Sequence, residues 1–356
     1  MISEITFASP TRLCHSLPVI FLAAVMAFGG LGCSKESIAP EDPLPEQPVL
    51  MNIGSQAFSI GTADEQINSL RILLVAKNIY GTVVCNRFIS NPSSTPLTVE
   101  VVGGKYDIYL IANEMPDYNP YTPLETVSNI KALRQIALPF APDNRTFTNI
   151  PMFGSVENVT ITPQPGPSQA TNLATITVAG VDMGTELPVT LTRMACKVNL
   201  TLKRTRGTMK AVEFNHLPDA IPLFAETYIT PGSHLLKAVA ISEFTETSDP
   251  GATYPLIAEQ KDILLPSWQF ADKGQAANAI QLKVTITENN GAERTYSSAI
   301  GHAADKGDYT LWRNQNYTLT ALVTNYIITT SAEVESWVDK TLGLEGGTPI
   351  VPPATP

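Results

Sequence analysis

The stretch "VTLTRMACKVNLTL" (Val189–Leu202) has the composition of one long β-strand, because apolar and β-branched residues dominate it. In this stretch apolar residues follow one another more often than they alternate with polar residues, which is typical of a central strand buried on both faces. Arg193 and Lys197 are the charged exceptions. We expect them to reach out at the strand ends or to pair across the sheet, in a structural role.

Shorter runs of the same kind extend along the chain, broken by Gly, Pro and Asn. They are Asn68–Lys77, Gly104–Asn113, Asn158–Pro163, Leu173–Gly180, Ala279–Ile300 and Asn314–Ile328. Within one of them the sequence "ENNGAE" predicts a hairpin, since Gly291 can supply a positive φ. Only "PLETVSNIKALRQI" (Pro123–Ile136) has helical spacing, through Val127, Ile130, Leu133 and Arg134, and it predicts a short surface helix over a sheet. The fold class is therefore all-β.

The N-terminal region has the layout of a lipoprotein signal. The apolar run "LPVIFLAAVMAFGGLG" (Leu17–Gly32) is too short to span a membrane and ends on small residues just before Cys33. We expect Cys33 to be lipidated. The alternative is an ordinary secretory peptide that is cut elsewhere, and in both cases the chain leaves the cytoplasm.

The residues after Cys33 are rich in proline and acids, a composition that favours an extended spacer over a packed core. A polar stretch, "RTRGT" (Arg204–Thr208), follows the long strand, and we place a domain boundary there. The expected division is a signal peptide (1–33), a linker (34–49), two β-sandwich domains (50–204 and 205–342) and a Pro/Gly-rich tail (343–356).

The composition bounds the function. The chain has 356 residues, 16% of them charged, and a net charge of −10, which disfavours nucleic-acid binding. His216, His234 and His302 show no metal-ligand spacing, and no phosphate loop or nucleophile elbow occurs. We therefore expect no enzyme activity, no cofactor and no metal, although the sequence does not exclude a catalytic pair of distant carboxylates.

Cysteine and aromatic residues leave further alternatives open. Cys85 and Cys196 are either a disulfide or two buried free thiols, and the apolar runs around them favour thiols. The tryptophans are either core or rim anchors or sugar-stacking rings, and we favour anchors; they are Trp268, Trp312 and Trp337. Tyr118 and Tyr121 form an exposed-looking cluster in a proline-rich loop.

Several segments together resemble a known family. They are "INSLRILLVAKNIYG" (67–81), "GGKYDIYLIANE" (103–114), "NIPMFGS" (149–155), "LPVTLTRMACKVNLTL" (187–202), "LWRNQNYTLTALV" (311–323) and "SAEVESWVD" (331–339). Their order and spacing resemble those of the fimbrillins of Bacteroidetes, the subunits of type V pili. The resemblance runs from about Asn52 to about Asp339.

This resemblance implies two tandem transthyretin-like β-sandwich domains, with the helix on the first. It also implies assembly with other fimbrial subunits. In that family a precursor reaches the cell surface as a lipoprotein and a protease removes its first strand. The C-terminal strand of another subunit then fills the vacated groove, which is strand addition. Here the segment Tyr326–Leu342 would be the donor strand with its approach, and it includes Tyr326, Val334 and Trp337, with Trp337 plugging a pocket in the neighbour.

One position departs from the pattern of shaft subunits, which carry an Arg just before an "AF" pair. Gln56 occupies that position here, and no Lys or Arg occurs between Lys35 and Arg71. We therefore predict an uncleaved, outer-membrane anchor or minor subunit that is surface-exposed and involved in adhesion. The alternatives are a polymerising shaft or tip fimbrillin, and a glycan-binding surface lipoprotein.

Overall fold

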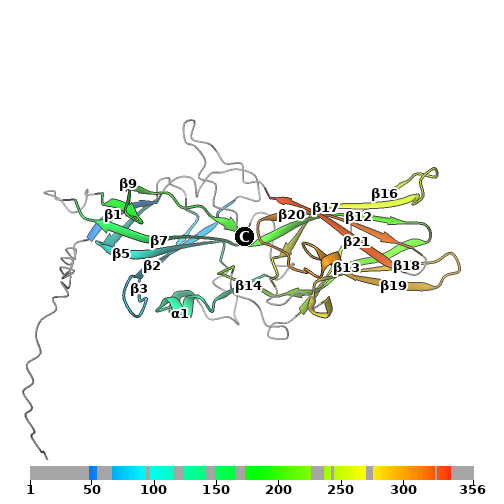
Figure 1. The fold of residues 1–356 in the computed structure, drawn as a ribbon, viewed down its shortest axis with the longest axis horizontal. Coiled ribbons are helices and arrows are strands. Elements are labelled where there is room, and N and C mark those ends of the chain that lie inside the picture. The colour runs from blue at the N-terminus through cyan, green and yellow to red at the C-terminus, as the bar shows by residue number, and fades with distance from the viewer. Residues whose placement is uncertain are drawn as a thin grey trace, which may run out of the picture. The chain divides into compact units, whose positions relative to one another are not determined.

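The computed structural model is built almost entirely of β-strands (Figure 1). It describes residues 48–53, 66–92, 97–114, 124–140, 149–164, 173–225, 236–241, 244–269, 276–324 and 327–337. The expected all-β class is confirmed, and the strands form two tandem sandwiches.

The first sandwich packs a three-stranded sheet against a larger one. In spatial order, the small sheet is β10 (Glu186–Leu187), β1 (Pro48–Ile53) and β4 (Leu97–Val102). The large sheet is β3 (Val83–Ser90), β2 (Ser69–Ala76), β5 (Gly104–Ala112), β7 (Met152–Thr162), β8 (Thr175–Val178) and β9 (Val181–Gly184), with β11 (Thr192–Arg193) also on β7. Alternate side chains of the two sheets interdigitate in one apolar core, which includes Met51, Ile72, Val99 and Ile108.

The second sandwich has a five-stranded and a four-stranded sheet. The first is β16 (Thr245–Ser248), β17 (Leu256–Pro266), β12 (Ala195–Arg204), β20 (Gln315–Val323) and β21 (Ile328–Ser336). The second is β15 (Leu236–Ile241), β13 (Thr208–Pro218), β18 (Gln281–Thr287) and β19 (Glu293–Ala299). Their shared core includes Leu200, Phe214, Val284 and Leu319.

A third apolar core covers the outer face of the large sheet of the first sandwich. It joins Leu73 and Tyr109 of that sheet to Leu133 of the short helix α1 (Ile130–Leu133) and to Trp337 near the C-terminal end of the described chain. The two-stranded sheet of β6 (Ala137–Pro139) and β14 (Ala220–Pro222) contributes to it as well. The 3-10 turns η3 (Leu124–Thr126), η5 (Ala276–Asn278) and η6 (Ala304–Lys306) complete the elements.

The long strand predicted over Val189–Leu202 is two strands. β11 pairs with β7 of the first sandwich, whereas β12 lies between β17 and β20 of the second. β12 is central, as predicted, but it is buried on one face only: its side chains alternate between buried and half-buried positions. The chain therefore changes sandwich at Met194, and the boundary placed after Arg204 is wrong, because both β12 and β13 belong to the second sandwich.

Two local predictions are confirmed with adjustments. Gly291 has a φ of +81° in the turn between β18 and β19, and its amide donates to the Glu288 carbonyl at 2.8 Å. The predicted helix over the sheet exists but is much shorter than the pattern suggests, with only Ile130–Leu133 as α-helix. Asn129 caps it by accepting a hydrogen bond from the Ala132 amide at 2.9 Å.

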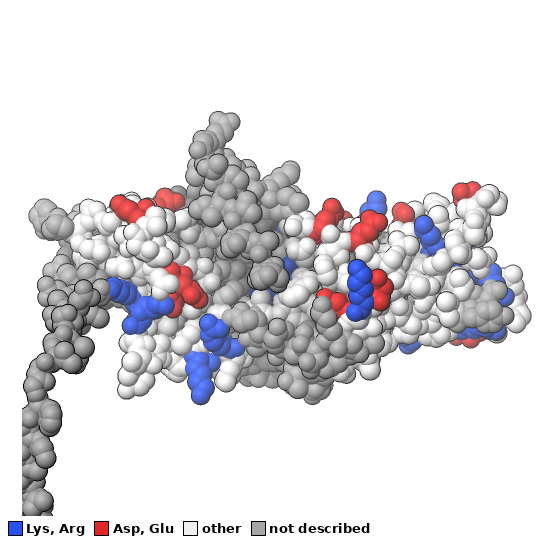
Figure 2. Space-filling view, in the orientation of Figure 1, with Lys and Arg blue, Asp and Glu red and all other residues white. Residues whose placement is uncertain are grey.

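The charged side chains are dispersed over the face drawn in Figure 2, where acids and bases lie among mostly uncharged residues. This agrees with the low share of charged residues, 16%. A membrane-crossing helix would need more length and apolar surface than any helix within the described residues has.

Candidate functional site

The first strand, β1, is the centre of the small sheet. It pairs antiparallel with β4 over its whole length, from Pro48 opposite Val102 to Ile53 opposite Leu97. On its other side it pairs in parallel with β10, and the Ala174 amide donates to the Leu50 carbonyl at 2.9 Å. Both edges of β1 are therefore engaged, although the strand is distant in sequence from β10.

The side chains of β1 contribute to the core of the first sandwich. Val49, Met51 and Ile53 point inward and are buried, whereas Asn52 is half-buried and accepts a hydrogen bond from the Thr98 hydroxyl at 2.8 Å. Burying an apolar side chain of this size contributes about 1.5–3 kcal/mol. Removing β1 would thus empty three core positions and leave β4 and β10 without their shared partner. β1 therefore fills a slot, by which we mean the gap between β4 and β10 that its backbone and inward side chains occupy.

The first basic residue that follows β1 in the sequence is Arg71, and it is enclosed. Arg71 lies in β2 with its side chain 2% exposed. Its Nε and Nη2 donate to the two carboxylate oxygens of Glu114 at 2.7 and 2.6 Å, and Nη2 also donates to Glu125 at 2.8 Å. Because Arg71 is buried within a strand, a protease could not open the folded chain there. Gln56 lies outside the described residues.

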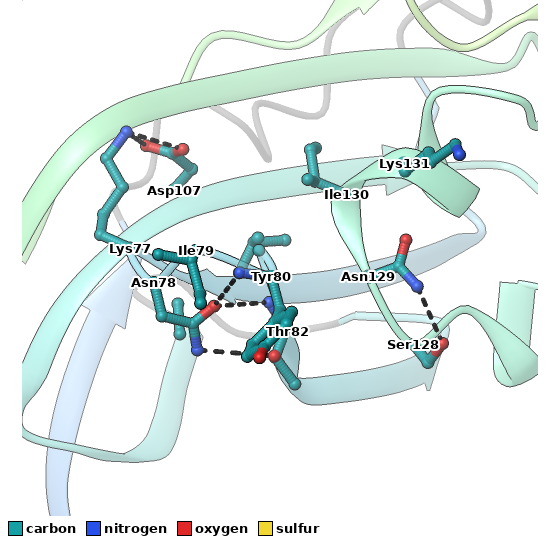
Figure 3. A pocket seen from close by; sticks show the side chains of 13 residues that line it. Lys77, Asn78, Ile79, Tyr80, Thr82, Asp107, Ser128, Asn129, Ile130 and Lys131 are labelled. Carbon is teal, nitrogen blue, oxygen red and sulfur yellow. Dashed lines mark hydrogen bonds and ion pairs between the residues drawn. The ribbon is translucent and has the colours of Figure 1, made fainter. Parts of the chain in front are cut away.

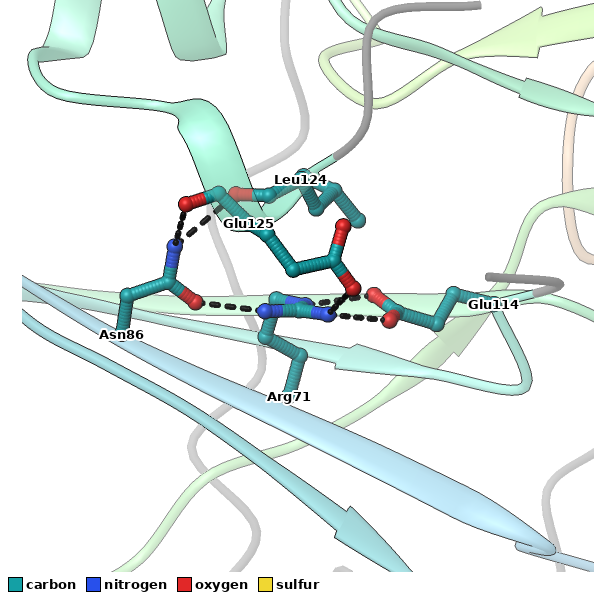
Figure 4. A network of polar contacts seen from close by, with 5 residues as sticks. All are labelled: Arg71, Asn86, Glu114, Leu124 and Glu125. Atoms are coloured by element: carbon teal, nitrogen blue, oxygen red, sulfur yellow. Dashed lines mark hydrogen bonds and ion pairs between the residues drawn. The ribbon is translucent and has the colours of Figure 1, made fainter. Parts of the chain in front are cut away.

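The contacts of Arg71 connect three parts of the first sandwich (Figure 4). Its Nη1 donates to the Asn86 side chain on β3, and the Asn86 amide group donates in turn to the Leu124 carbonyl at 2.8 Å. The guanidinium also lies 5.3 Å from the centre of the Phe88 ring. Burial alone would lower the pKa of Arg71, but the hydrogen bonds and charges of Glu114 and Glu125 outweigh it and raise that pKa. Arg71 therefore stays charged and holds η3 against the sheet.

At the other end of the chain, β21 is already paired. It runs antiparallel to β20 from Ile328 opposite Val323 to Ser336 opposite Gln315, and Val334 is half-buried against the second core. The Thr330 hydroxyl also connects β21 to β19 of the facing sheet, because it hydrogen-bonds to the Ser298 hydroxyl at 2.9 Å and donates to the Ala299 carbonyl at 3.4 Å. Tyr326 lies outside the described residues.

Trp337 is not presented to a neighbour in this structure. Its side chain is buried, with 4% of the residue exposed, in the third core. Arg193 lies 4.9 Å and Lys197 5.3 Å from its rings, so both cations contact the aromatic surface. Arg193 also donates to Asn314 at 3.2 Å, and Lys197 pairs with Asp262 at 3.5 Å. The structural role expected of Arg193 and Lys197 is thus observed, whereas the docking of Trp337 into a neighbour would first require its release.

The two cysteines of the folded part are free thiols. Cys196 is buried in the second core and Cys85 packs against the first, so they belong to different sandwiches. Burial raises the pKa of both thiols, although Arg87 offsets part of the effect at Cys85. The preference for free thiols over a disulfide is confirmed, with Cys196 buried and Cys85 half-buried.

Other candidate residues do not converge. Within the described ranges, no group of three His, Cys, Asp or Glu side chains is placed to hold a metal ion. His216 lies in β13, 3.3 Å from the Ala279 carbonyl, whereas His302 lines a separate small cavity near β21. Trp268 and Trp337 are buried, as expected of anchors, and Trp312 is 41% exposed. His234, Tyr118 and Tyr121 lie outside the described residues.

The fold is shared with solved structures of fimbrial and adhesion proteins. A fimbrillin from Porphyromonas gingivalis is 13% identical over 82% of this chain and 98% of that one, with a TM-score of 0.50. Two proposed cell adhesion proteins from Parabacteroides distasonis are each 12% identical with a TM-score of 0.50; the matches cover 82% and 83% of this chain and 97% and 99% of theirs. No family model and no curated protein matches the sequence.

These matches show the fold. The chain has the tandem β-sandwich architecture of the fimbrillins. The order and spacing of the sequence segments indicated the same architecture. The first and the last described strands are both paired within the chain: β1 lies in the middle of the small sheet and β21 at the edge of the second sandwich.

Proposed function

We propose that this protein is a non-enzymatic fimbrial lipoprotein that keeps its first strand and serves as the anchor at the membrane-bound base of an adhesive fimbrium. Cys33 would carry the lipid, including a palmitoyl chain, in the outer membrane. The partners would be other fimbrial subunits, joined by strand addition. A subunit with β1 in place can donate a strand but has no vacant slot to accept one.

One observation carries this proposal. β1 is fully integrated into the small sheet and its core, and the next basic residue, Arg71, is buried and held by Glu114 and Glu125. An Arg- or Lys-specific protease would therefore have no site between β1 and β2. The fimbrillin-like fold supports a role in fimbriae.

Donation from the C-terminus is the second element of the proposal. Within the described residues β21 pairs with one strand, β20, and its exposed side chains include two acids, Glu333 and Glu335. Acids on an edge strand disfavour indiscriminate pairing with other edges. We infer that β21 leaves β20 only when a specific acceptor subunit offers a slot, and that Trp337 leaves the third core in the same event.

The anchor role is tested by Cys33→Ala in cells that assemble fimbriae. Acyl chains supply about 0.8 kcal/mol per buried methylene, so the substitution should free the protein from the membrane. If the protein is a base, assembled fimbriae should appear in the medium together with it. Fimbriae that remain on the cells while the substituted protein is released would instead favour a shaft or tip subunit. Unchanged membrane association would contradict lipidation.

A further inference from the structure

The turn between β2 and β3 presents two apolar side chains to solvent. Ile79 is 90% and Tyr80 74% exposed, the highest values among the large apolar side chains in the part of the chain that the structure describes. Neither residue contributes to the three cores. Exposed tyrosines that packing does not explain are typical of binding surfaces.

The turn is held in one conformation. The Asn78 side-chain oxygen accepts hydrogen bonds from the amides of Tyr80 and Thr82, at 3.1 and 3.3 Å. Gly81 has a φ of +55°, and a Cβ there would lie 2.4 Å from the Ile130 side chain, so only glycine fits. Ile79 and Tyr80 are therefore presented by a preorganised turn, which lowers the entropic cost of binding.

An open groove lies beside this turn (Figure 3). Its volume is about 870 Å³, and its walls come from the turn, from Asp107 of β5 and from residues 128–131 at the start of α1. Small-molecule sites usually have volumes of about 300–1,000 Å³, with apolar walls and a few polar groups. The groove has that size and that mixture.

The polar groups of the groove are a fixed ion pair and one further cation. Lys77 contacts both carboxylate oxygens of Asp107 at 2.9 Å, and Asp107 also accepts from the Asn158 amide at 2.9 Å. A donor and an acceptor are thus held side by side, which suits adjacent hydroxyl groups. Lys131 is exposed and forms no ion pair within the described residues, so the groove carries one excess positive charge in a chain of net charge −10.

An extended peptide is a poorer match for this groove. The main chain at the start of β3, beside the groove, is already used: the Val83 amide donates to the Ser128 carbonyl at 2.9 Å, and the Ile130 amide donates to the Gly81 carbonyl at 2.8 Å. Strand addition gains its affinity from such unpaired main-chain groups. A peptide strand could therefore not pair with the main chain at this point.

We propose that this groove binds a carboxylate-bearing glycan. The Tyr80 ring stacks on the apolar face of a sugar, the Lys77–Asp107 pair hydrogen-bonds to neighbouring hydroxyls, and Lys131 pairs with the carboxylate. The site is separate from the Tyr118 and Tyr121 cluster. It is also independent of the anchor assignment, since it does not involve β1 or β21.

The test uses the mature protein in detergent on an array of sialylated and uronate-containing oligosaccharides together with their neutral counterparts, followed by titration of the best binder. Tyr80→Ala should weaken binding at least about tenfold, whereas Tyr80→Phe, which keeps the stacking face, should retain it. Lys131→Ala should lose the preference for acidic over neutral sugars. Trp312→Ala, an exposed aromatic on the other sandwich, is the matched control and should bind like the parent.

Three results would overturn the proposal. They are the absence of binding to every glycan by the parent protein, equal binding by Tyr80→Ala and the parent, and a Tyr80-dependent preference for neutral sugars. Binding of an acidic peptide library through Tyr80 without any glycan binding would reassign the groove to peptides. Matching urea-unfolding curves for the variants would show that the loss of binding is not a loss of folding.

Discussion

Arg71 connects β2, β3 and η3 on the outer face of the first sandwich. Its guanidinium and the Glu114 carboxylate are both almost fully buried, with side-chain exposures of 2% and 3%. A buried ion pair adds little net stability over an apolar pair, but the loss of one partner leaves a charge without compensation. The pair therefore fixes the position of η3 and Asn86 more than it adds net stability.

Substitution of Glu114 by Ala should lower the free energy of unfolding by about 3–5 kcal/mol, because Arg71 would keep only Glu125 as a counter-ion. Urea denaturation measures the change. Glu293→Ala is the control, since Glu293 pairs with Lys210 at a half-exposed site and should cost about 1 kcal/mol or less. Equal losses for the two variants would contradict the enclosed network.

The Arg71 network was not predicted from the sequence, although a signal existed. Arg71 interrupts the apolar run "LRILLVA", and Glu114 ends the apolar run "YLIANE". A charge inside a buried strand requires a partner, so an acid on a neighbouring strand end could have been sought. The choice of Glu114 and Glu125 needs the register of β2 on β5 and the position of η3, which depend on contacts distant in sequence.

Among the elements, β1 is the one whose placement bears most on function. Its inward residues fill the core between the two sheets of the first sandwich, and its backbone joins β4 to β10. If β1 is a permanent strand, substitutions at its core positions should lower the free energy of unfolding as much as those in any other strand.

Met51→Ala should destabilise the protein by about 2–5 kcal/mol, as expected for a large-to-small change in a packed core. Asn52→Ala, on the opposite face of the same strand, should cost about 1 kcal/mol through the lost hydrogen bond to Thr98. Thermal or urea unfolding of the first sandwich distinguishes them. A Met51 variant as stable as the parent would indicate that β1 contributes little to the fold.

The C-terminal strand gives a parallel prediction. Trp337→Ala should destabilise the protein by about 3–5 kcal/mol, because Trp337 is buried in the chain's own third core. Trp312→Ala, at 41% exposure, should cost clearly less. Similar unfolding midpoints for the two variants would mean that Trp337 is already free in solution.

The positions of the strands along the sequence could be predicted better than the strands with which each one pairs. Runs such as Asn68–Lys77 and Gly104–Asn113 carry the β pattern locally, and the "ENNGAE" hairpin requires only Gly291. The break at Met194 could not be predicted, because "LTRMACKV" stays β-prone while its two halves pair with sheets of different sandwiches. The contacts of Trp337 with Arg193 and Lys197 could not be predicted either, because they join residues distant in sequence.

At the scale of the whole molecule, we propose that the chain keeps its first strand and its lipid. β1 fills the centre of the small sheet, β21 lies at the edge of the second sandwich beside β20, and the basic residue nearest to β1 on its C-terminal side is enclosed. In the proposed role, such a subunit would end an assembly at the membrane. A subunit that loses β1 would instead present an open slot and extend the assembly.

N-terminal analysis by mass spectrometry of the protein recovered from the outer membrane distinguishes these two kinds of subunit. For an anchor, we expect an intact chain that begins at a lipidated Cys33 and includes Pro48–Ile53. A mature chain that begins near Ala57, without β1, would contradict the anchor role and identify a polymerising subunit.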